Sequence, residues 1–119
     1  MPDRVLLDTN ILIRHLAESP NTPAPSSAAI SVLTVFEVLR YSGMTPTEEH
    51  ALHILIEACE ILPVYHTIAQ RAAELGRTRS TKAIDLLIAA TAIDYGIPLI
   101  TKNIRDFKDI PGLDLQEHF

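Results

Sequence analysis

The sequence is poor in the residues that usually hold small secreted proteins together. It has no tryptophan, one cysteine and only 5% aromatic residues in a chain of 119. Because Cys59 is the only cysteine, an internal disulfide and a cysteine-based zinc site are excluded. No apolar run approaches the length of a membrane span, and no signal-peptide pattern opens the chain. We therefore expect a soluble, cytoplasmic protein with a core of aliphatic side chains.

An excess of basic charge is also missing. The net charge is −5, which argues against a protein that coats nucleic acid, since such proteins are usually basic. It does not exclude an enzyme acting on nucleic acid, because carboxylates around a divalent metal add negative charge that the metal neutralises. Locally, basic residues gather in two clusters: Arg77, Arg79 and Lys82, then Lys102, Arg105 and Lys108. The first cluster is explained equally well by contacts to RNA phosphates and by an ordinary charged loop.

Short apolar strands alternate with helices along the chain. The length suits one compact domain, expected over residues 1–119. Strands are predicted just before residue 8 and at 28–32, 61–65, 97–101 and 113–115, and helices at 10–18, 34–42, 46–60, 66–77, 80–95 and 103–108. This alternation predicts an α/β fold with a mostly parallel sheet. In such sheets, ligands bind at the carboxyl ends of the strands.

Two acids follow the first two predicted strands, and each has a structural and a functional explanation. Asp8 interrupts the apolar stretch VLLDTNIL, where it can cap the next helix or hold a ligand. Asn10 either orients that carboxylate or caps locally. Glu37 lies three residues after Thr34, a spacing typical of a capping box. A functional Glu37 would instead face the sheet edge beside Asp8.

Asp85 is the most informative acid because it lies in the very apolar segment KAIDLLIAATAID. On a helix, its neighbours three and four residues away are Thr81, Lys82, Ile88 and Ala89. A carboxylate beside an apolar stripe is costly unless it is paired or binds a metal. A functional role is therefore at least as well supported as a structural salt bridge with Lys82.

A fourth acid, Asp106, follows the buried strand predicted at 97–101. It can be a first-turn acid of a short helix capped by Asn103. Alternatively, Asp106, Asn103 and Thr101 line a site at the end of that strand.

Taken together, the four acids converge in a parallel sheet. Asp8, Glu37 and Asp106 follow strands, and Asp85 enters at a helix start. Carboxylates in one small volume raise each other's pKa unless a cation neutralises them. Mg²⁺ and Mn²⁺ prefer oxygen ligands, keep several waters and bind through few carboxylates plus substrate phosphates. The pattern thus predicts one or two such ions and metal-assisted phosphodiester hydrolysis.

Four stretches, in order, resemble the successive motifs of PIN-domain ribonucleases: LLDTNIL, SVLTVFEVL, AIDLLIAATA and LITKNIRDF. The similarity is greatest to VapC-type toxins of toxin–antitoxin pairs, and it covers nearly the whole chain. By this resemblance, Asp8, Glu37 and Asp85 occupy the family's three main acidic positions. Many relatives carry a fourth acid where this chain has Asn103, and others use the acid of the following DF pair. Asp106 is therefore the candidate fourth ligand.

The resemblance also implies an architecture and partners. It implies a PIN-domain-like three-layer sandwich, with a central parallel sheet of four or five strands flanked by helices. It further implies Mg²⁺- or Mn²⁺-dependent cleavage of RNA, typically tRNA or rRNA, as well as homodimerisation and inhibition by a small antitoxin. The supporting site residues on this basis are Asn10, Thr34, Thr101 and Asn103.

Two other functions remain as alternatives. One is a phosphatase with Asp8 as nucleophile, which the position at the end of the first strand suits. The chain lacks a second acid at Asn10, however, and no lysine follows a middle strand in the needed context. The other alternative is a non-catalytic PIN-like binding module whose acids only cap helices. The presence of all three main acids argues against it.

Overall fold

The centre of the molecule is a five-stranded parallel sheet in the order β3-β2-β1-β4-β5. The computed structural model describes residues 4–19 and 22–118. The strands are β1 (Val5–Leu7), β2 (Ala28–Ser31), β3 (Glu60–Leu62), β4 (Leu99–Ile100) and β5 (Leu115–Gln116). In the register, Leu6 of β1 lies opposite Ala29 on one side and Leu99 on the other. The predicted α/β fold with a parallel sheet is confirmed.

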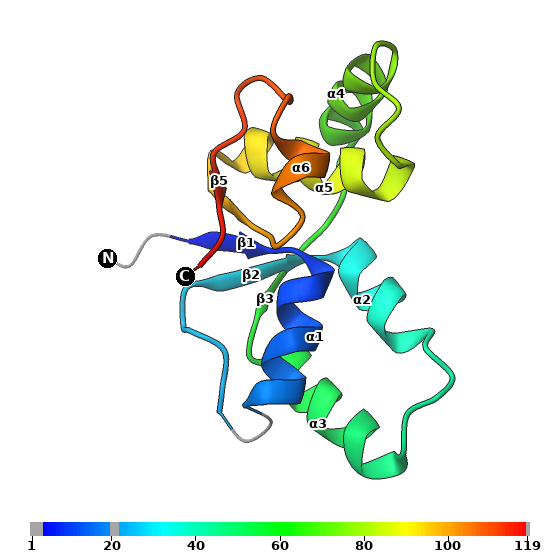
Figure 1. Ribbon diagram of the computed structural model, residues 1–119, viewed down its shortest axis with the longest axis vertical. Helices are drawn as coiled ribbons and strands as arrows, with labels where there is room; N and C mark the ends of the chain where they lie inside the picture. Colours follow the sequence, from blue (N-terminus) through cyan, green and yellow to red (C-terminus); the bar gives the residue numbers. More distant parts are fainter. Residues whose placement is uncertain (1–3, 20–21, 119) are drawn as a thin grey trace.

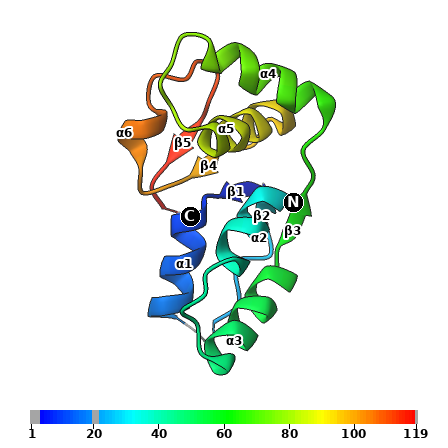
Figure 2. The same ribbon diagram turned by 90° about the vertical axis from the view of Figure 1, so that its right-hand side faces the viewer.

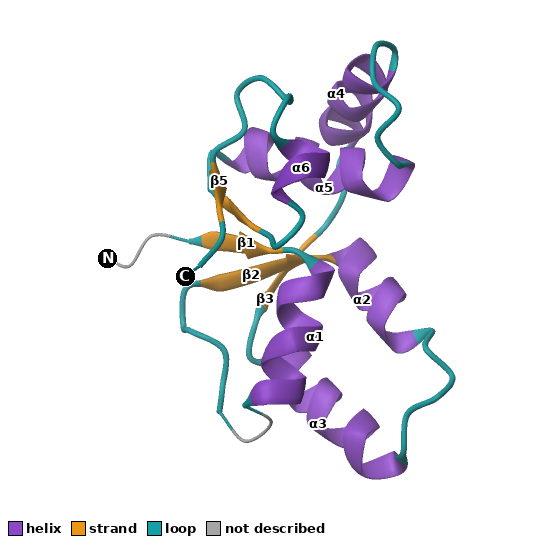
Figure 3. Ribbon diagram, in the orientation of Figure 1, coloured by secondary structure: helices purple, strands orange, loops and turns teal. Residues whose placement is uncertain are grey.

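Helices cover both faces of this sheet. They are α1 (Thr9–Glu18), α2 (Val32–Leu39), α3 (Pro46–Glu57), α4 (His66–Gly76), α5 (Ala83–Tyr95) and α6 (Ile104–Phe107). Figures 1 and 2 show α1, α2 and α3 on one face and α4, α5 and α6 on the other. Coloured by secondary structure, the three layers are plain in Figure 3. None of these helices, in the part of the chain that the structure describes, is long and apolar enough to cross a membrane.

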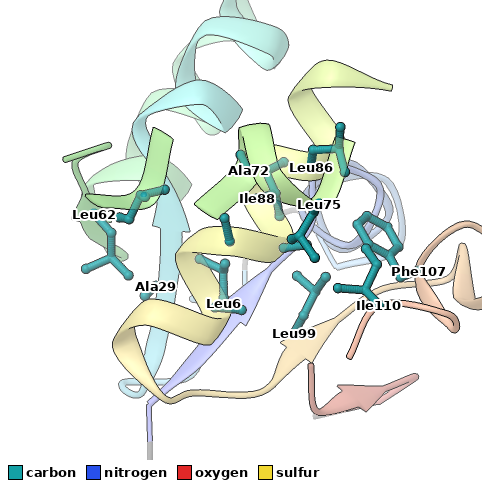
Figure 4. Packing of buried hydrophobic residues seen from close by; sticks show 14 residues of the cluster. Leu6, Ala29, Leu62, Ala72, Leu75, Leu86, Ile88, Leu99, Phe107 and Ile110 are labelled. Atoms are coloured by element: carbon teal, nitrogen blue, oxygen red, sulfur yellow. The ribbon is translucent and has the colours of Figure 1, made fainter. Parts of the chain in front are cut away.

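Alternating strand residues divide the core into two apolar clusters, one on each face. Leu6 and Leu99 join the cluster under α4 and α5, while Leu7 and Ile100 join the cluster under α1 and α3. This is the period of two expected of strands buried on both faces. Figure 4 shows Leu6 and Leu99 packed with Ile88 of α5.

Strand order places a switch point beside β1. The chain moves outward from β1 to β2 and β3 on one side, and to β4 and β5 on the other. Helices leaving neighbouring strands therefore diverge at the carboxyl ends of β1 and β4, which is where α/β sheets bind ligands. Asp8 follows β1 and Thr101 follows β4 at this point, and the backbone N–H of Asp8 donates to the carbonyl of Ile100 at 2.9 Å.

Several helix starts differ from the sequence predictions. α2 begins at Val32, directly after β2, because Ser31 Oγ accepts from the backbone N–H of Leu33 at 3.0 Å and caps the helix. Thr34 therefore lies inside the helix, and the capping box predicted for Thr34 and Glu37 is wrong. α5 begins at Ala83 rather than at residue 80. Its predicted end is confirmed.

Glycine explains that end. Gly96 follows α5 with a φ of 67°, the left-handed conformation that glycine adopts without steric cost. The chain then turns back directly into β4, which brings Thr101 beside Asp8.

Candidate active site

All four predicted acids line one cleft at the carboxyl ends of the strands. The cleft has a volume of about 470 Å³. Its polar lining residues are Asp8, Thr9, Asn10, Arg14, Glu37, Lys82, Asp85, Asn103 and Asp106. They come from α1, α2, α5, α6 and the residues just before these helices, so segments far apart in the sequence supply one site. The acids are together as the strand pattern predicted, while their roles as metal ligands and catalytic groups stay predictions.

Asp8 is buried and held in one orientation by three hydrogen bonds. Its Oδ1 accepts from the backbone N–H of Thr9 at 2.8 Å, at the start of α1. Its Oδ2 accepts from Thr101 Oγ1 at 2.8 Å and from Asn10 Nδ2 at 3.1 Å. Asp8 is therefore both the cap of α1 and a fixed carboxylate in the cleft, so the two explanations of this residue hold together.

Burial dominates the electrostatics of Asp8. Desolvation raises the pKa of its carboxyl above the ordinary value, the hydrogen bonds from Thr101 and Thr9 lower it, and the negative charge of Glu37 raises it again. The net direction is upward, so the free carboxylate is costly at this position.

Asn10 fastens the ends of β1 and β4 to each other. Its side-chain Nδ2 donates to Asp8, and its Oδ1 accepts from the backbone N–H of Lys102 at 3.2 Å. Thr101 Oγ1 also accepts from the backbone N–H of Asn103 at 3.0 Å. These contacts support the prediction that Asn10 orients the Asp8 carboxylate rather than only capping a helix.

Thr9 contributes to the site through a contact that the sequence analysis did not predict. Its hydroxyl donates to Glu37 Oε1 at 2.7 Å, and the hydroxyl oxygens of Thr9 and Thr34 lie 3.3 Å apart. Glu37 thus faces the cleft beside Asp8, where the hydroxyl of Thr9 in α1 holds its carboxylate. The only signal in the sequence was the position of Thr9 between two residues already singled out.

Asp85 lies among the other acids without a cation partner. The pKa of its carboxyl is raised, first by burial and then by the negative charges of Asp8, Glu37 and Asp106, while Lys82 lowers it. Within residues 4–19 and 22–118, no side-chain nitrogen of Lys, Arg or His lies within 4.0 Å of a carboxylate oxygen of the four acids. The predicted alternative of a salt bridge between Asp85 and Lys82 is therefore wrong.

Asp106 is the one exposed acid of the four, and Asn103 near it is exposed as well. Asn103 stands at the cap position of α6, but its side chain makes no capping hydrogen bond, so the predicted cap is wrong. Asp106 lies in the first turn of α6, as predicted, and is exposed.

The donor chemistry of the cleft fits a hard divalent cation, although the side chains do not form a closed cage. No group of three or more His, Cys, Asp or Glu side chains among the described residues has an arrangement that holds a metal ion. Mg²⁺, however, usually keeps several waters and takes one or two protein carboxylates. An all-oxygen set of acids without cation partners, one of them fixed by hydrogen bonds, meets that need.

Comparison with known proteins places the chain in a family. A family model described as the PIN domain matches residues 5–113, a span that contains all four acids. The chain belongs to the PIN-domain family. Ribonuclease VapC19 of Mycobacterium tuberculosis is 32% identical to this PIN domain over an alignment of 121 residues. The alignment covers 91% of this chain and 95% of the relative. The resemblance to VapC-type PIN domains is confirmed.

Solved structures agree with this assignment. A toxin–antitoxin complex from Klebsiella pneumoniae contains a chain 31% identical to this PIN domain, with a TM-score of 0.73 over 92% of this chain and 94% of that one. A DNA-bound VapBC from Salmonella typhimurium gives a TM-score of 0.75 at 27% identity, over 97% and 98% of the two chains. The expected three-layer PIN fold is confirmed.

Proposed function

We propose that this PIN domain is an endoribonuclease that cuts RNA phosphodiester bonds at the acidic cleft, with Mg²⁺ or Mn²⁺, as the toxin of a toxin–antitoxin pair. The observation that carries the proposal is the convergence of four acids, with no cation partner among the described residues, in one cleft. A relative covering most of the chain is named a ribonuclease, and ribonucleases of this family generally depend on divalent metal.

Asp8, Glu37, Asp85 and Asp106 would hold one or two divalent ions. When bound, such an ion neutralises the acids, polarises the phosphoryl group and lowers the pKa of bound water. The protein fixes the acids in advance: Thr101 and Asn10 orient Asp8, and Thr9 orients Glu37. Preorganised carboxylates need no rearrangement when the substrate arrives.

If Asp8, Glu37 and Asp85 alone hold one ion, we assign the orientation of the attacking water to Asp106 instead. It is exposed, and its carboxylate makes no hydrogen bond or ion pair to the described residues, so its oxygens are available to accept a proton. Asn103, on the same side of the cleft, then holds water or the ion weakly through its amide oxygen.

The phosphatase alternative has less support in the geometry. A nucleophilic Asp8 needs a carboxylate oxygen directed at the substrate, but both oxygens already accept hydrogen bonds from Thr9, Asn10 and Thr101. A non-catalytic module would have no need for four acids that destabilise one another.

The partner of the toxin is a cognate antitoxin, since matched solved structures are complexes of a toxin with an antitoxin. An apolar groove of about 810 Å³ between α1, α2 and α3 suits a segment of such a partner. Ile13 and Tyr41 are exposed in it, and Thr9 and Glu37 line both this groove and the acidic cleft. A bound segment with a basic residue would therefore reach the acids. We also propose a homodimer that acts on tRNA or rRNA in the cytoplasm.

The test is cleavage of total cellular RNA by the purified protein, with and without Mg²⁺, and with the cut sites mapped by sequencing the fragment ends. We expect discrete cuts with Mg²⁺, none with EDTA, and no hydrolysis of p-nitrophenyl phosphate. Intact RNA under all conditions, or rapid hydrolysis of the monoester, would overturn the proposal.

A further inference from the structure

A second cleft continues from the acidic one. It has a volume of about 540 Å³ and shares Lys82, Asp85 and Asp106 with the acidic cleft. Beyond these residues, its walls are the segment 78–81 before α5, Arg105 of α6, and Asp109 and Ile110 after α6. We call this space the flanking cleft. Its size lies within the range of about 300–1,000 Å³ typical of ligand pockets, so it has room for a nucleotide.

The flanking cleft has more basic side chains than the site beside it: Arg79, Lys82 and Arg105. Its acids among the described residues are Asp109 and the shared Asp85 and Asp106. A metal held by the two shared acids would neutralise them, which would leave three cations against one acid. Among the described residues, no carboxylate lies within ion-pair distance of these three cations. Their charges therefore remain available to an anion from solution.

Arg79 joins the two walls of the flanking cleft. Its Nη1 donates to the carbonyl of Leu75 at 3.2 Å and its Nη2 to the carbonyl of Asp109 at 3.1 Å. The first carbonyl lies near the end of α4 and the second just after α6. Arg79 is thus a positioning residue, while Lys82 and Arg105 are exposed and make no ion pair with the described residues.

The opposite side of the acidic cleft differs. Arg14 leads there into a smaller space of about 300 Å³, but its guanidinium pairs with Glu18 at 3.0 Å. Lys102 in that space lies beside Glu117 and His118. Two cations face Glu18 and Glu117 here, and neither acid belongs to the proposed metal site. With metal bound, this side would therefore attract a phosphate chain less than the flanking cleft does.

We propose that the flanking cleft binds the RNA backbone on one side of the bond to be cut, with Lys82 and Arg105 contacting its phosphates. This inference rests on the proposed ribonuclease function. A protein with a net charge of −5 repels RNA as a whole, so a local set of unneutralised cations next to the site offsets that repulsion. The substrate is then an RNA strand that continues past the cut site in one direction.

The test compares Arg105→Gln with Lys108→Gln. Both changes remove one positive charge from an exposed residue at or just after α6, but only Arg105 lines the flanking cleft. The probe is a synthetic RNA oligonucleotide that carries a cut site mapped on total RNA. For Arg105→Gln we expect KM to rise roughly tenfold with kcat changed less than about twofold, because a ground-state phosphate contact is lost.

Two further readouts separate a phosphate contact from a structural effect. The slope of log(kcat/KM) against log[salt] should become shallower by about 0.7 in Arg105→Gln, as expected for one lost phosphate contact to a single strand. Phosphate ethylation should block cleavage by the parent protein on one side of the cut site only, and part of this interference should disappear in Arg105→Gln. Lys108→Gln should match the parent protein in both assays.

The outcomes are distinguishable. A parent protein that cuts RNA while Arg105→Gln and Lys108→Gln give the same KM and salt slope would overturn the flanking-cleft proposal alone. Equal ethylation interference on both sides of the cut would do the same. A parent protein that cuts no RNA overturns the proposed function, and this inference with it.

Discussion

The two ends of the sheet differ in how their acidic side chains are paired with basic ones. At the amino ends of the strands, Arg4 precedes β1 and Glu60 begins β3, and Arg4 Nη1 lies 2.8 Å and 2.9 Å from the two carboxylate oxygens of Glu60. The Arg4 guanidinium also stacks 5.5 Å from the ring centre of Tyr95. At the carboxyl ends, four acids share a cleft, and no basic side chain among the described residues forms an ion pair with them.

This difference separates charges that are paired within the fold from charges that are left without a partner. Glu60 is neutralised by a residue of the same chain, so nothing from outside is needed to make it stable. Asp8 and Asp85 have raised pKa values because burial and neighbouring acids disfavour their charged forms. A cation from solution is the simplest way to stabilise them, and we attribute the function of the protein to that end of the sheet.

The largest expected effect comes from removing the carboxylate of Asp8 or that of Asp85. Asp8→Asn and Asp85→Asn keep the shape of the side chain but remove a negative charge from the cleft. We expect each to lower kcat/KM for RNA cleavage by at least about 1,000-fold, as losses of catalytic groups do in other hydrolases. The measurement is initial rates on the mapped oligonucleotide, with circular dichroism to show that the fold is retained.

Glu60→Gln is the matched control at the other end of the sheet. It also replaces a carboxylate by an amide, but far from the acidic cleft, and we expect RNA cleavage within about twofold of the parent rate. If Glu60→Gln lost as much activity as Asp8→Asn, the contrast between the two ends would be wrong.

A smaller effect is expected at Thr9. Thr9→Val keeps the side-chain shape but removes the hydroxyl that donates to Glu37 Oε1. Residues that orient a metal-binding carboxylate typically contribute about 10- to 100-fold, and we expect a loss of activity in that range. Thr9→Ser should restore most of the rate, because serine supplies the same donor. Equal activity of Thr9→Val and the parent protein would show that this contact does not orient Glu37 for catalysis.

Stability without metal should change in the direction opposite to activity. The pKa of Asp85 in the folded protein is raised above its ordinary value of 3.8. The free energy of unfolding therefore falls as the pH rises from this ordinary value through the raised pKa of the folded state. In EDTA at pH 7, Asp85→Asn should therefore be more stable than the parent protein, by only about 0.5 kcal/mol because Asp85 is partly exposed.

Urea unfolding at pH 7 and near pH 3.5 measures this effect. The gain should be present at pH 7 and shrink near pH 3.5, where Asp85 is more than half protonated in the unfolded state and more so in the folded state. A loss of stability at pH 7 would mean that Asp85 makes a favourable contact in the metal-free fold.

A comparably small effect on stability, and none on activity, is expected at the amino end of the sheet. Arg4→Gln removes the ion pair with Glu60 and the stacking on Tyr95, but these groups are partly exposed. We expect a loss of about 0.5–1 kcal/mol in the free energy of unfolding, measured in urea, and unchanged RNA cleavage. A loss of activity would show that this end of the sheet is not purely structural.

The sequence predicts the parallel sheet and the meeting of the four acids because both follow from local patterns. Short apolar segments predict the strands of the sheet, and Gly96 ends α5 as expected. Acids that follow parallel strands must lie at the same edge of the sheet. The helix starts were harder to predict from the sequence. Both Ser31 and Thr34 are residue types that cap helices, and Ser31 caps α2 because it lies at the end of β2.

The contacts that hold the site in place were beyond the sequence. The hydrogen bond from Thr9 to Glu37 spans 28 positions, and the one from Thr101 to Asp8 spans 93. Capping-box spacing suggested a local partner for Glu37, whereas the fold supplies a distant one. Such pairs depend on how the helices and strands pack, and a short sequence motif does not predict that packing.

The most direct test of the central claim is a titration with Mn²⁺ followed by the electron paramagnetic resonance signal of the free ion. It compares the parent protein with Asp8→Asn, Asp85→Asn and Glu60→Gln. We predict that the parent protein and Glu60→Gln remove Mn²⁺ from solution alike, and that the other two variants bind it at least about tenfold more weakly. Equal Mn²⁺ binding by all four proteins would contradict the claim that the acids at the carboxyl ends of the strands hold the metal.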